Sequence, residues 1–199
     1  MRARTLSSLR LFAISLATLL TISGCGYNEI QGLDENVKAA WGEVQNQYQR
    51  RADLVPNLVS TVKGAAQFEQ QTLQQVIEAR AQATSVKLDA NALSNPETFK
   101  KFEEAQRNLS GALSRLLVVV ERYPDLKANA NFRDLQAQLE GTENRIAVAR
   151  KRYVESVAEY NKRVRYFPTN LTAKYLLGLD VRQSFSADDA ASKPPQVNF

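Results

Sequence analysis

The sequence predicts an all-α protein, folded as an antiparallel up-and-down four-helix bundle with long helices and an extended C-terminal tail. Three observations lead to this fold class. Apolar residues recur three and four positions apart along most of the chain after residue 28, which is the period of an amphipathic helix. No run of β-branched residues alternates with polar ones as a strand would. Proline and asparagine stand where the apolar pattern is interrupted.

The composition fits a folded domain and excludes several kinds of chemistry. The 199 residues are 44% hydrophobic and 24% charged, as in an ordinary globular protein. Histidine is absent and cysteine occurs once, so the chain can form no Ser-His or Cys-His couple, no His-containing zinc site and no intrachain disulfide. We therefore expect no catalytic residue, no metal and no cofactor. The net charge of +5 includes three arginines in the first ten residues, so the remainder does not predict nucleic-acid binding.

The N-terminus is typical of a secretory signal. After the arginines, the apolar run Leu11–Ile22 is shorter than the roughly 20 residues that a membrane-spanning helix needs. The next residues, Ile22-Ser23-Gly24-Cys25, resemble the bacterial lipobox, in which the cysteine is lipidated and becomes the first residue of the mature chain. We predict a signal peptide over residues 1–24 and a lipidated tether over residues 25–28. The alternative is an uncleaved transmembrane helix in the inner membrane.

The residue after the cysteine bears on localisation. In many Gram-negative lipoproteins an aspartate at this position signals retention in the inner membrane, and here the residue is Gly26. We therefore expect a membrane-anchored lipoprotein of the bacterial envelope, on the periplasmic face of the outer membrane if the source is Gram-negative. The membrane is then its first partner. The protein would be attached to it through acyl chains on Cys25, of which two or more are needed for stable anchoring.

The predicted bundle spans residues 29–167 and carries one apolar stripe for each helix. The first stripe is Ile30, Leu33, Val37, Trp41, Val44 and Tyr48, and the second is Leu54 or Val55, Leu58, Val62, Ala65, Leu73, Val76 and Ala79. The third is Phe99, Phe102, Gln106, Leu109, Leu113, Leu116, Val120 and Tyr123. The fourth is Phe132, Leu135, Leu139, Thr142, Ile146, Ala149, Tyr153, Val157, Tyr160, Val164 and Phe167. Beyond it, residues 168–199 are predicted to be a C-terminal tail, in which Leu171–Leu179 could form one or two short amphipathic turns and residues 184–199 are expected to be extended or loose.

Capping residues predict where the later helices begin and end. Asn95, followed by proline, suits the N-cap of the third helix, and Ser94 with Glu97 is an alternative capping box. Pro124 ends the third helix, because the residue before a proline is disfavoured in the α conformation. Asn131 is expected to cap the fourth helix.

The stretch Asp53–Pro56 leaves two interpretations open. It allows a new helix with Asp53 as its cap, or a proline kink in one continuous helix. A continuous helix to about residue 84 would be roughly 80 Å long, whereas the third helix could cover only ~40 Å of it. We therefore predict a turn.

Several segments together resemble the LemA family. They are Arg50–Val59 with Thr61–Gly64, Tyr123–Asn129 and Glu140–Arg150, and the similarity extends from Tyr27 to Phe199. The resemblance implies a tethered four-helix antiparallel bundle of bacterial envelopes without an established activity. Many members have a true transmembrane helix, whereas this chain has a lipobox. Because members are often encoded beside other membrane proteins, metalloproteases included, the predicted function is a non-catalytic scaffold or adaptor for membrane proteins. The alternative is an accessory or regulatory subunit of an envelope protease.

The second half of the fourth helix is strongly basic. Arg152, Lys162, Arg163 and Arg165 are candidate contacts to anionic lipid headgroups, because an up-and-down bundle places this end beside Cys25. The alternative is that the positive charges only complement the negative end of the helix dipole.

Two further groups are polar. Arg50 and Arg51 would lie at the turn, about 40 Å from the membrane, as candidate partner contacts or merely as C-terminal helix charges. Glu140 and Glu143 could form an acid–base pair. The preferred interpretation is an interhelical salt bridge, with Thr142 or Asn144 fixing the register of the helices by hydrogen bonding.

Overall fold

A computed structural model of the chain describes residues 2–64, 69–90 and 92–186, with side chains described from Gly26 onward. The helices are α1 (Arg2–Lys63), α2 (Gln70–Ser85), α3 (Pro96–Val120), α4 (Pro124–Ala128), α5 (Ala130–Arg165) and α6 (Thr169–Leu171). A 3₁₀ turn, η1 (Ala92–Ser94), precedes α3, and a π-helical turn, η2 (Thr172–Leu176), follows α6. No strand occurs among the described residues, which confirms the all-α class.

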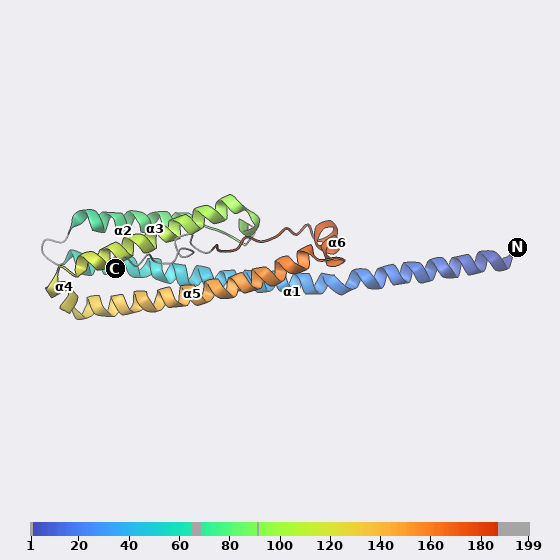
Figure 1. The fold of residues 1–199 in the computed structure, drawn as a ribbon, viewed down its shortest axis with the longest axis horizontal. Helices are drawn as coiled ribbons and strands as arrows, with labels where there is room; N and C mark the ends of the chain where they lie inside the picture. Colours follow the sequence, from blue (N-terminus) through green and yellow to red (C-terminus); the bar gives the residue numbers. More distant parts are fainter. Residues whose placement is uncertain (1, 65–68, 91, 187–199) are drawn as a thin grey trace, which may run out of the picture.

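The helices form an elongated body in which α1 is the longest element (Figure 1). With 62 residues, α1 is roughly 90 Å long, and its N-terminal part extends beyond all the other helices. The remainder of α1 packs along α5, while α2 packs on α3 and on the last part of α1. The chain reverses direction between α1 and α2, between α2 and α3, and between α3 and α5 (Figure 1).

Two clusters of buried side chains fill the interior and contain most members of the four predicted apolar stripes, although the second stripe is divided between α1 and α2. One cluster joins the last turns of α1 to α2, α3, α4 and the beginning of α5. The other joins residues 30–48 of α1 to α3, the second half of α5 and residues 173–185. The exceptions are near the ends of the stripes, where Leu33, Tyr123, Leu135 and Val164 are only partly buried and Phe167 is exposed. Ala65 of the second stripe lies outside the described residues.

The predicted turn at Asp53–Pro56 is wrong, because α1 continues through Pro56 to Lys63. A proline has no N–H, and in a helix it leaves the carbonyl four residues earlier without a donor. Here that carbonyl belongs to Ala52, and Arg80 Nε of α2 donates a hydrogen bond to it at 2.8 Å. Asp53 is not a cap but accepts a hydrogen bond from Gln49 one turn earlier. The chain reverses instead after Gly64, between α1 and α2.

Of the two predicted N-caps, the cap of α3 is confirmed and the cap of α5 is wrong. Asn95 caps α3, since its side-chain oxygen accepts hydrogen bonds from the backbone N–H groups of Glu97 and Thr98. Asn131 lies inside α5, whose cap is Asn129; the Asn129 side chain accepts from the N–H of Phe132. The short helix α4 ends directly before Asn129, so α5 begins two residues earlier than predicted.

Residues 177–186, here called the C-terminal strap, are extended but not loose. Arg182 exchanges two backbone hydrogen bonds with the side chain of Asn161, at 2.8 and 2.9 Å. Tyr153 and Tyr160 donate their hydroxyl hydrogens to the carbonyls of Gln183 and Asp180. These bonds fasten residues 180–183 to α5. Residues 184–186, the described beginning of the tail predicted from Ser184 onward, lie outside any helix, in agreement with the extended alternative. Residues 187–199 lie outside the described part of the chain.

Candidate functional site

The end of the body at which α1 emerges is the first candidate site. We call it the base: residues 26–33 of α1, the last turn of α5 (residues 162–165) and residues 166–176. Arg163 Nε donates to Glu29 Oε1 at 2.6 Å and so ties α5 to α1. Gly26 lies so close to Thr169 that a Cβ at this position would stand 2.7 Å from Thr169 Cγ2. The base therefore joins the last turn of α5 directly to the residues that follow Cys25.

Thr169 holds the base together from the other side. Its hydroxyl lies within hydrogen-bond distance of the carbonyls of Arg163 (2.7 Å) and Tyr166 (2.8 Å), two carbonyls at the end of α5. These contacts stabilise a helix end whose last carbonyls would otherwise lack donors. They also fix Thr169 in place, so that a side chain larger than hydrogen at Gly26 has little room.

The structure brings three of the four predicted headgroup contacts together at the base. Lys162, Arg163 and Arg165 lie in the last turn of α5. Lys162 and Arg165 are exposed, whereas Arg163 is half-buried in its ion pair with Glu29. Arg152 is exposed but lies three helical turns or more before them, beside Glu155 and Glu159. Arg152 is therefore not part of the base.

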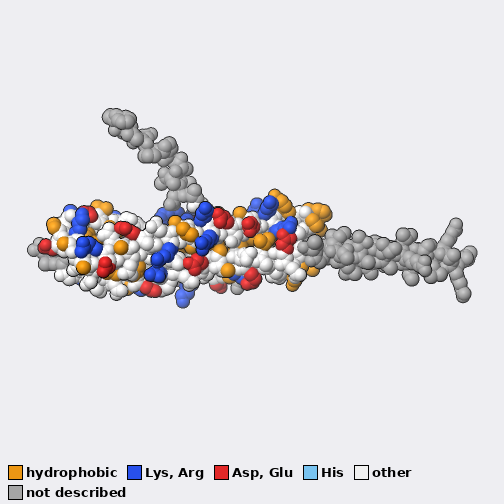
Figure 2. Space-filling view, turned by 90° about the horizontal axis from the view of Figure 1, so that it is seen from below, with side chains coloured by type: hydrophobic (Ala, Val, Ile, Leu, Met, Phe, Trp, Pro, Cys, Tyr) orange, Lys and Arg blue, Asp and Glu red, His pale blue; other side chains and the backbone are white. Residues whose placement is uncertain are grey.

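The sequence pattern missed the apolar side chains of the base. Phe167 continues the fourth stripe in the sequence, but its side chain is 80% exposed because α5 ends at Arg165. The other large exposed side chains at the base are Tyr27, Tyr166, Leu171, Tyr175 and Leu176. Figure 2 shows hydrophobic side chains gathered at this end of the described surface. A Tyr-Phe-Pro sequence directly after a cluster of basic residues is the signal that could have indicated them.

The partner contact predicted for Arg51 is wrong, because Arg51 is 1% exposed and lies in the interior of α1. Its guanidinium donates to Glu143 (2.8 Å), to Ser110 (2.6 Å) and to the side chain of Gln106 (2.6 Å). It also lies over the ring of Tyr48, 5.0 Å from the centroid. Arg51 therefore connects α1, α3 and α5 at mid-height and reaches no partner.

Arg50, by contrast, is exposed on α1, though not at a turn. Thirteen residues of α1 follow it, so it lies on the side of the body, and the tip expected there is formed by other residues. Its role as a partner contact stays a prediction.

The carboxylates of α5 confirm the structural interpretation of the segment around Thr142. Glu143 forms the interhelical ion pair with Arg51, and Glu140 accepts from Gln136 on its own helix. The two carboxylates thus have separate partners. Thr142 donates to the carbonyl of Gln138 one turn earlier, and Asn144 is exposed. The ion pair of Arg51, and not Thr142 or Asn144, links the helices.

A second arginine, Arg182, is largely buried and fastens the C-terminal strap to α1. Arg182 donates to Asp34 of α1 at 2.8 Å, and also to the hydroxyl of Ser94 and the carbonyl of Ala90. Burial acts to raise the pKa of Asp34, but hydrogen bonds from Lys38 and Arg182 outweigh it and lower that pKa below its ordinary value. The charge pair therefore favours an ionised Asp34 that fastens the strap to α1.

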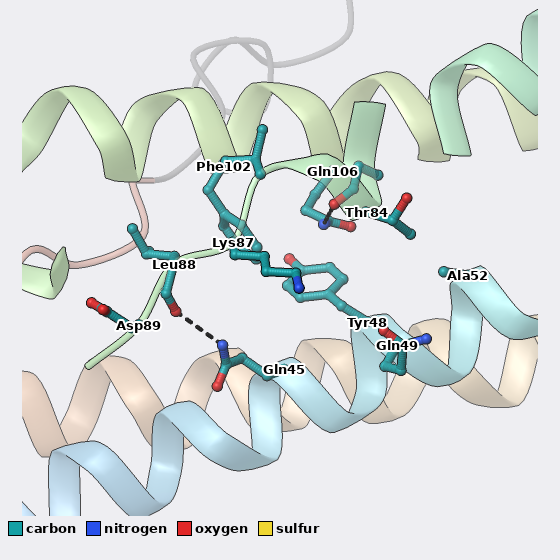
Figure 3. A pocket seen from close by; sticks show the side chains of 12 residues that line it. Gln45, Tyr48, Gln49, Ala52, Thr84, Lys87, Leu88, Asp89, Phe102 and Gln106 are labelled. Atoms are coloured by element: carbon teal, nitrogen blue, oxygen red, sulfur yellow. Dashed lines mark hydrogen bonds between the residues drawn. The ribbon is translucent and has the colours of Figure 1, made fainter. Parts of the chain in front are cut away.

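A hollow of about 370 Å³ opens between α1 and the segment that joins α2 to α3 (Figure 3). Three of its lining residues are amides, namely Gln45, Gln49 and Gln106, which form hydrogen bonds but do not transfer protons near neutral pH. Gln45 donates to the carbonyl of Leu88 at 2.9 Å, as does Trp41 from beneath. These contacts hold the α2–α3 segment on α1.

The described side chains contain no cluster of three or more carboxylates or thiols suited to a metal ion. Among the same residues, no helix is both long and apolar enough to cross a membrane. The predicted lipidation site, Cys25, lies in the helical backbone of α1, but its side chain is outside the described residues.

Comparison with known proteins gives one match and one absence. The sequence model of the LemA family matches residues 40–199, which include the last 24 residues of α1 and all that follows it. No curated protein matches the chain.

Proposed function

The chain belongs to the LemA family, and on that premise we propose that it is a non-catalytic scaffold of the bacterial envelope, anchored to a membrane at its N-terminus. LemA proteins are not a known enzyme family. In this proposal α1, α2, α3 and α5 act together as an antiparallel four-helix bundle that presents its long sides to other membrane proteins. Exposed residues such as Arg50 would contribute to those sides.

One observation carries the proposal. The predicted cleavage point before Cys25 coincides with the place where α1 leaves the body, because Gly26 already contacts Thr169 at the base. Acyl chains on Cys25 would therefore enter the bilayer immediately beside the base. The basic last turn of α5 would then face the headgroups, and each exposed Lys or Arg near an anionic surface contributes about 1 kcal/mol.

Metabolic labelling with an alkyne fatty acid tests the anchor. We expect the wild-type chain to be labelled and the Cys25→Ser variant to be unlabelled, because Cys25 is the only cysteine. A matched control carries Cys25→Ser together with Val148→Cys, which restores a thiol at an exposed position of α5 and should remain unlabelled. Equal labelling of wild type and Cys25→Ser would refute the lipoprotein assignment.

Crosslinking in intact cells, followed by mass spectrometry, tests the scaffold role. A scaffold should yield membrane proteins crosslinked to its exposed helix faces. Recovery of an envelope protease as the principal partner would support the alternative, a regulatory subunit. Recovery of no membrane protein at all would refute both.

The orientation of the body has its own test, with a chain that begins at Gly26 and lacks the lipid. It should bind vesicles containing phosphatidylglycerol at low salt and release them as ionic strength rises, since the attraction decays over a Debye length. Replacing Lys162 and Arg165 by glutamate should abolish this binding. Replacing Lys63 and Arg133, exposed at the opposite end, changes the charge equally and should not. If both pairs of substitutions reduce vesicle binding equally, the attraction depends only on the total charge and no particular face of the protein is turned to the membrane.

A further inference from the structure

The base exposes more large hydrophobic side chains than the rest of the described surface. Among the residues whose side chains are described, nine large hydrophobic side chains are exposed, and six of them lie at the base. The other three, Ile77, Val118 and Val148, stand singly on α2, α3 and α5. Single exposed apolar residues are ordinary, whereas a gathered patch marks a surface that meets another apolar phase. We call Tyr166, Phe167, Leu171, Tyr175 and Leu176 the base patch.

The base patch is held outward by folded backbone. Ala173, between its members, is completely buried against the second core cluster. The N–H of Asn170 donates to the carbonyl of Tyr166 at 2.8 Å, and that of Leu179 to the carbonyl of Ala173 at 2.9 Å. These bonds fix the turn that carries Phe167 and Tyr175, with exposed fractions of 80% and 73%. The side chains therefore cannot fold back onto the core without breaking that turn.

Cations accompany the aromatic rings of the patch. The ammonium of Lys162 lies 5.5 Å from the centroid of the Tyr166 ring, and that of Lys174 lies 5.7 Å from the Tyr175 ring. Arg165 is exposed in the same last turn of α5. Aromatic rings with polar tips, aliphatic side chains and flexible cations are the combination found where a protein surface meets the boundary between lipid headgroups and acyl chains.

We propose that the base patch inserts into the headgroup–acyl boundary of an anionic bilayer, as a second membrane contact beside the N-terminal anchor. The proposal rests on the proposed function, which brings the base to the membrane. The charge of Lys162, Arg165 and Lys174 complements anionic lipid, and Gly26, the neighbour of the predicted lipidation site Cys25, lies against Thr169 beside the patch. With two contacts, the body stands in a fixed orientation on the bilayer.

Quenching by lipid-borne bromine tests the insertion. The full chain is reconstituted in vesicles of equal parts phosphatidylglycerol and phosphatidylethanolamine, with bromine on the acyl chains near the headgroups. Trp41 is buried in the body, so the wild-type chain gives the baseline. Phe167→Trp and Tyr175→Trp should each be quenched several-fold more than this baseline. The matched control, Val118→Trp, places tryptophan at a similarly exposed apolar position on α3 and should remain at the baseline.

The outcomes separate this inference from the proposed function. In one outcome, tryptophan at position 167 is quenched no more than tryptophan at position 118 although the chain still sediments with the vesicles. This result overturns the insertion of the base patch and is compatible with the N-terminal anchor. A chain that fails to sediment overturns both. Protection of position 167 from aqueous acrylamide without quenching by brominated lipid would show that a second protein surface, such as another copy of the chain, covers the patch. That result also overturns the insertion.

Charge gives an independent measurement on the same samples. Lys162→Glu with Lys174→Glu should reduce the quenching at position 167 in anionic vesicles and have little effect in vesicles of phosphatidylcholine alone. Lys63→Glu with Arg133→Glu, at the opposite end, should leave it unchanged. If neither double substitution changes the quenching at position 167, then Lys162 and Lys174 do not contribute to insertion.

Discussion

Arg80 should stabilise the protein only because Pro56 interrupts the hydrogen bonding of α1. The Ala52 carbonyl lacks its helical donor, since residue 56 has no N–H, and Arg80 Nε supplies one at 2.8 Å. Pro56→Ala would restore the N–H at an exposed position without removing packing. The carbonyl would then have a donor in its own helix, and Arg80 would become largely dispensable. The two substitutions should therefore be coupled.

The magnitudes follow from the bonds involved. A hydrogen bond from a charged donor contributes roughly 1.5–3 kcal/mol, and Arg80 is only partly buried, so we expect Arg80→Ala to cost about 1–2 kcal/mol. Proline in a helix interior costs about 3 kcal/mol relative to alanine, but it also restrains the unfolded chain by ~1 kcal/mol. Pro56→Ala should therefore stabilise by about 2 kcal/mol. In that background Arg80→Ala should cost ~1 kcal/mol less than in the wild type.

Urea unfolding followed by circular dichroism measures all four members of the cycle, in a chain that begins at Gly26. Arg145→Ala removes an exposed arginine of α5 and is the control for a general effect of charge. It should change stability by less than ~0.5 kcal/mol in either background. Effects of Pro56→Ala and Arg80→Ala that add to within ~0.3 kcal/mol would refute the reasoning. So would a destabilising Pro56→Ala, since it would show that α1 needs the proline.

Three other substitutions address the core and the strap. Arg51→Ala should lower the free energy of unfolding in urea by about 3 kcal/mol, because it leaves buried acceptors without a donor. Arg50→Ala, at an exposed position, should lower it by less than ~0.5 kcal/mol. Equal urea midpoints for the two variants would contradict the stabilising role of the Arg51 hydrogen bonds. Leu139→Asp should lower stability by ~3 kcal/mol or more, and an unchanged melting temperature would place Leu139 outside the core. The pKa of Asp34 is lowered in the folded state, so its contribution is present above the ordinary pKa of about 4 and is lost as pH falls through the folded value. Asp34→Asn should therefore destabilise at pH ~7, and the gap to wild type should narrow below pH ~4; a constant gap would show that the charge of Asp34 is not involved.

Local patterns were sufficient for the helical class and for most of the core. The apolar stripes predict which side chains are buried, since a helix turns by a fixed angle per residue and any residue three or four positions along lies on the same face. The cap at Asn95 was also readable, because a side-chain oxygen and a following proline act within one turn. The juxtaposition of the basic end of α5 with the residues after Cys25 followed from the alternation of helix directions.

The errors arose where distant residues decide a local outcome. Pro56 by itself favours a break, and only Arg80, on another helix, makes the continuous α1 acceptable. Arg51 resembles its neighbour Arg50 in the sequence, yet one is buried and the other exposed, because the rotation of α1 directs Arg51 towards α3 and α5. Phe167 fits the fourth stripe, but α5 ends before it.

The sequence by itself determined the helical class, the buried faces, the absence of histidine and disulfide chemistry, and the position of Cys25 beside a short apolar segment. These depend on residue type and on spacing within a helix, which are local properties of the chain. The tertiary structure alone decided the course of α1, the burial of Arg51, the docking of the strap by Arg182 and the apolar surface of the base. Each of these depends on which donor, acceptor or apolar surface a distant segment brings within a few ångströms, and that is fixed only when the helices pack together.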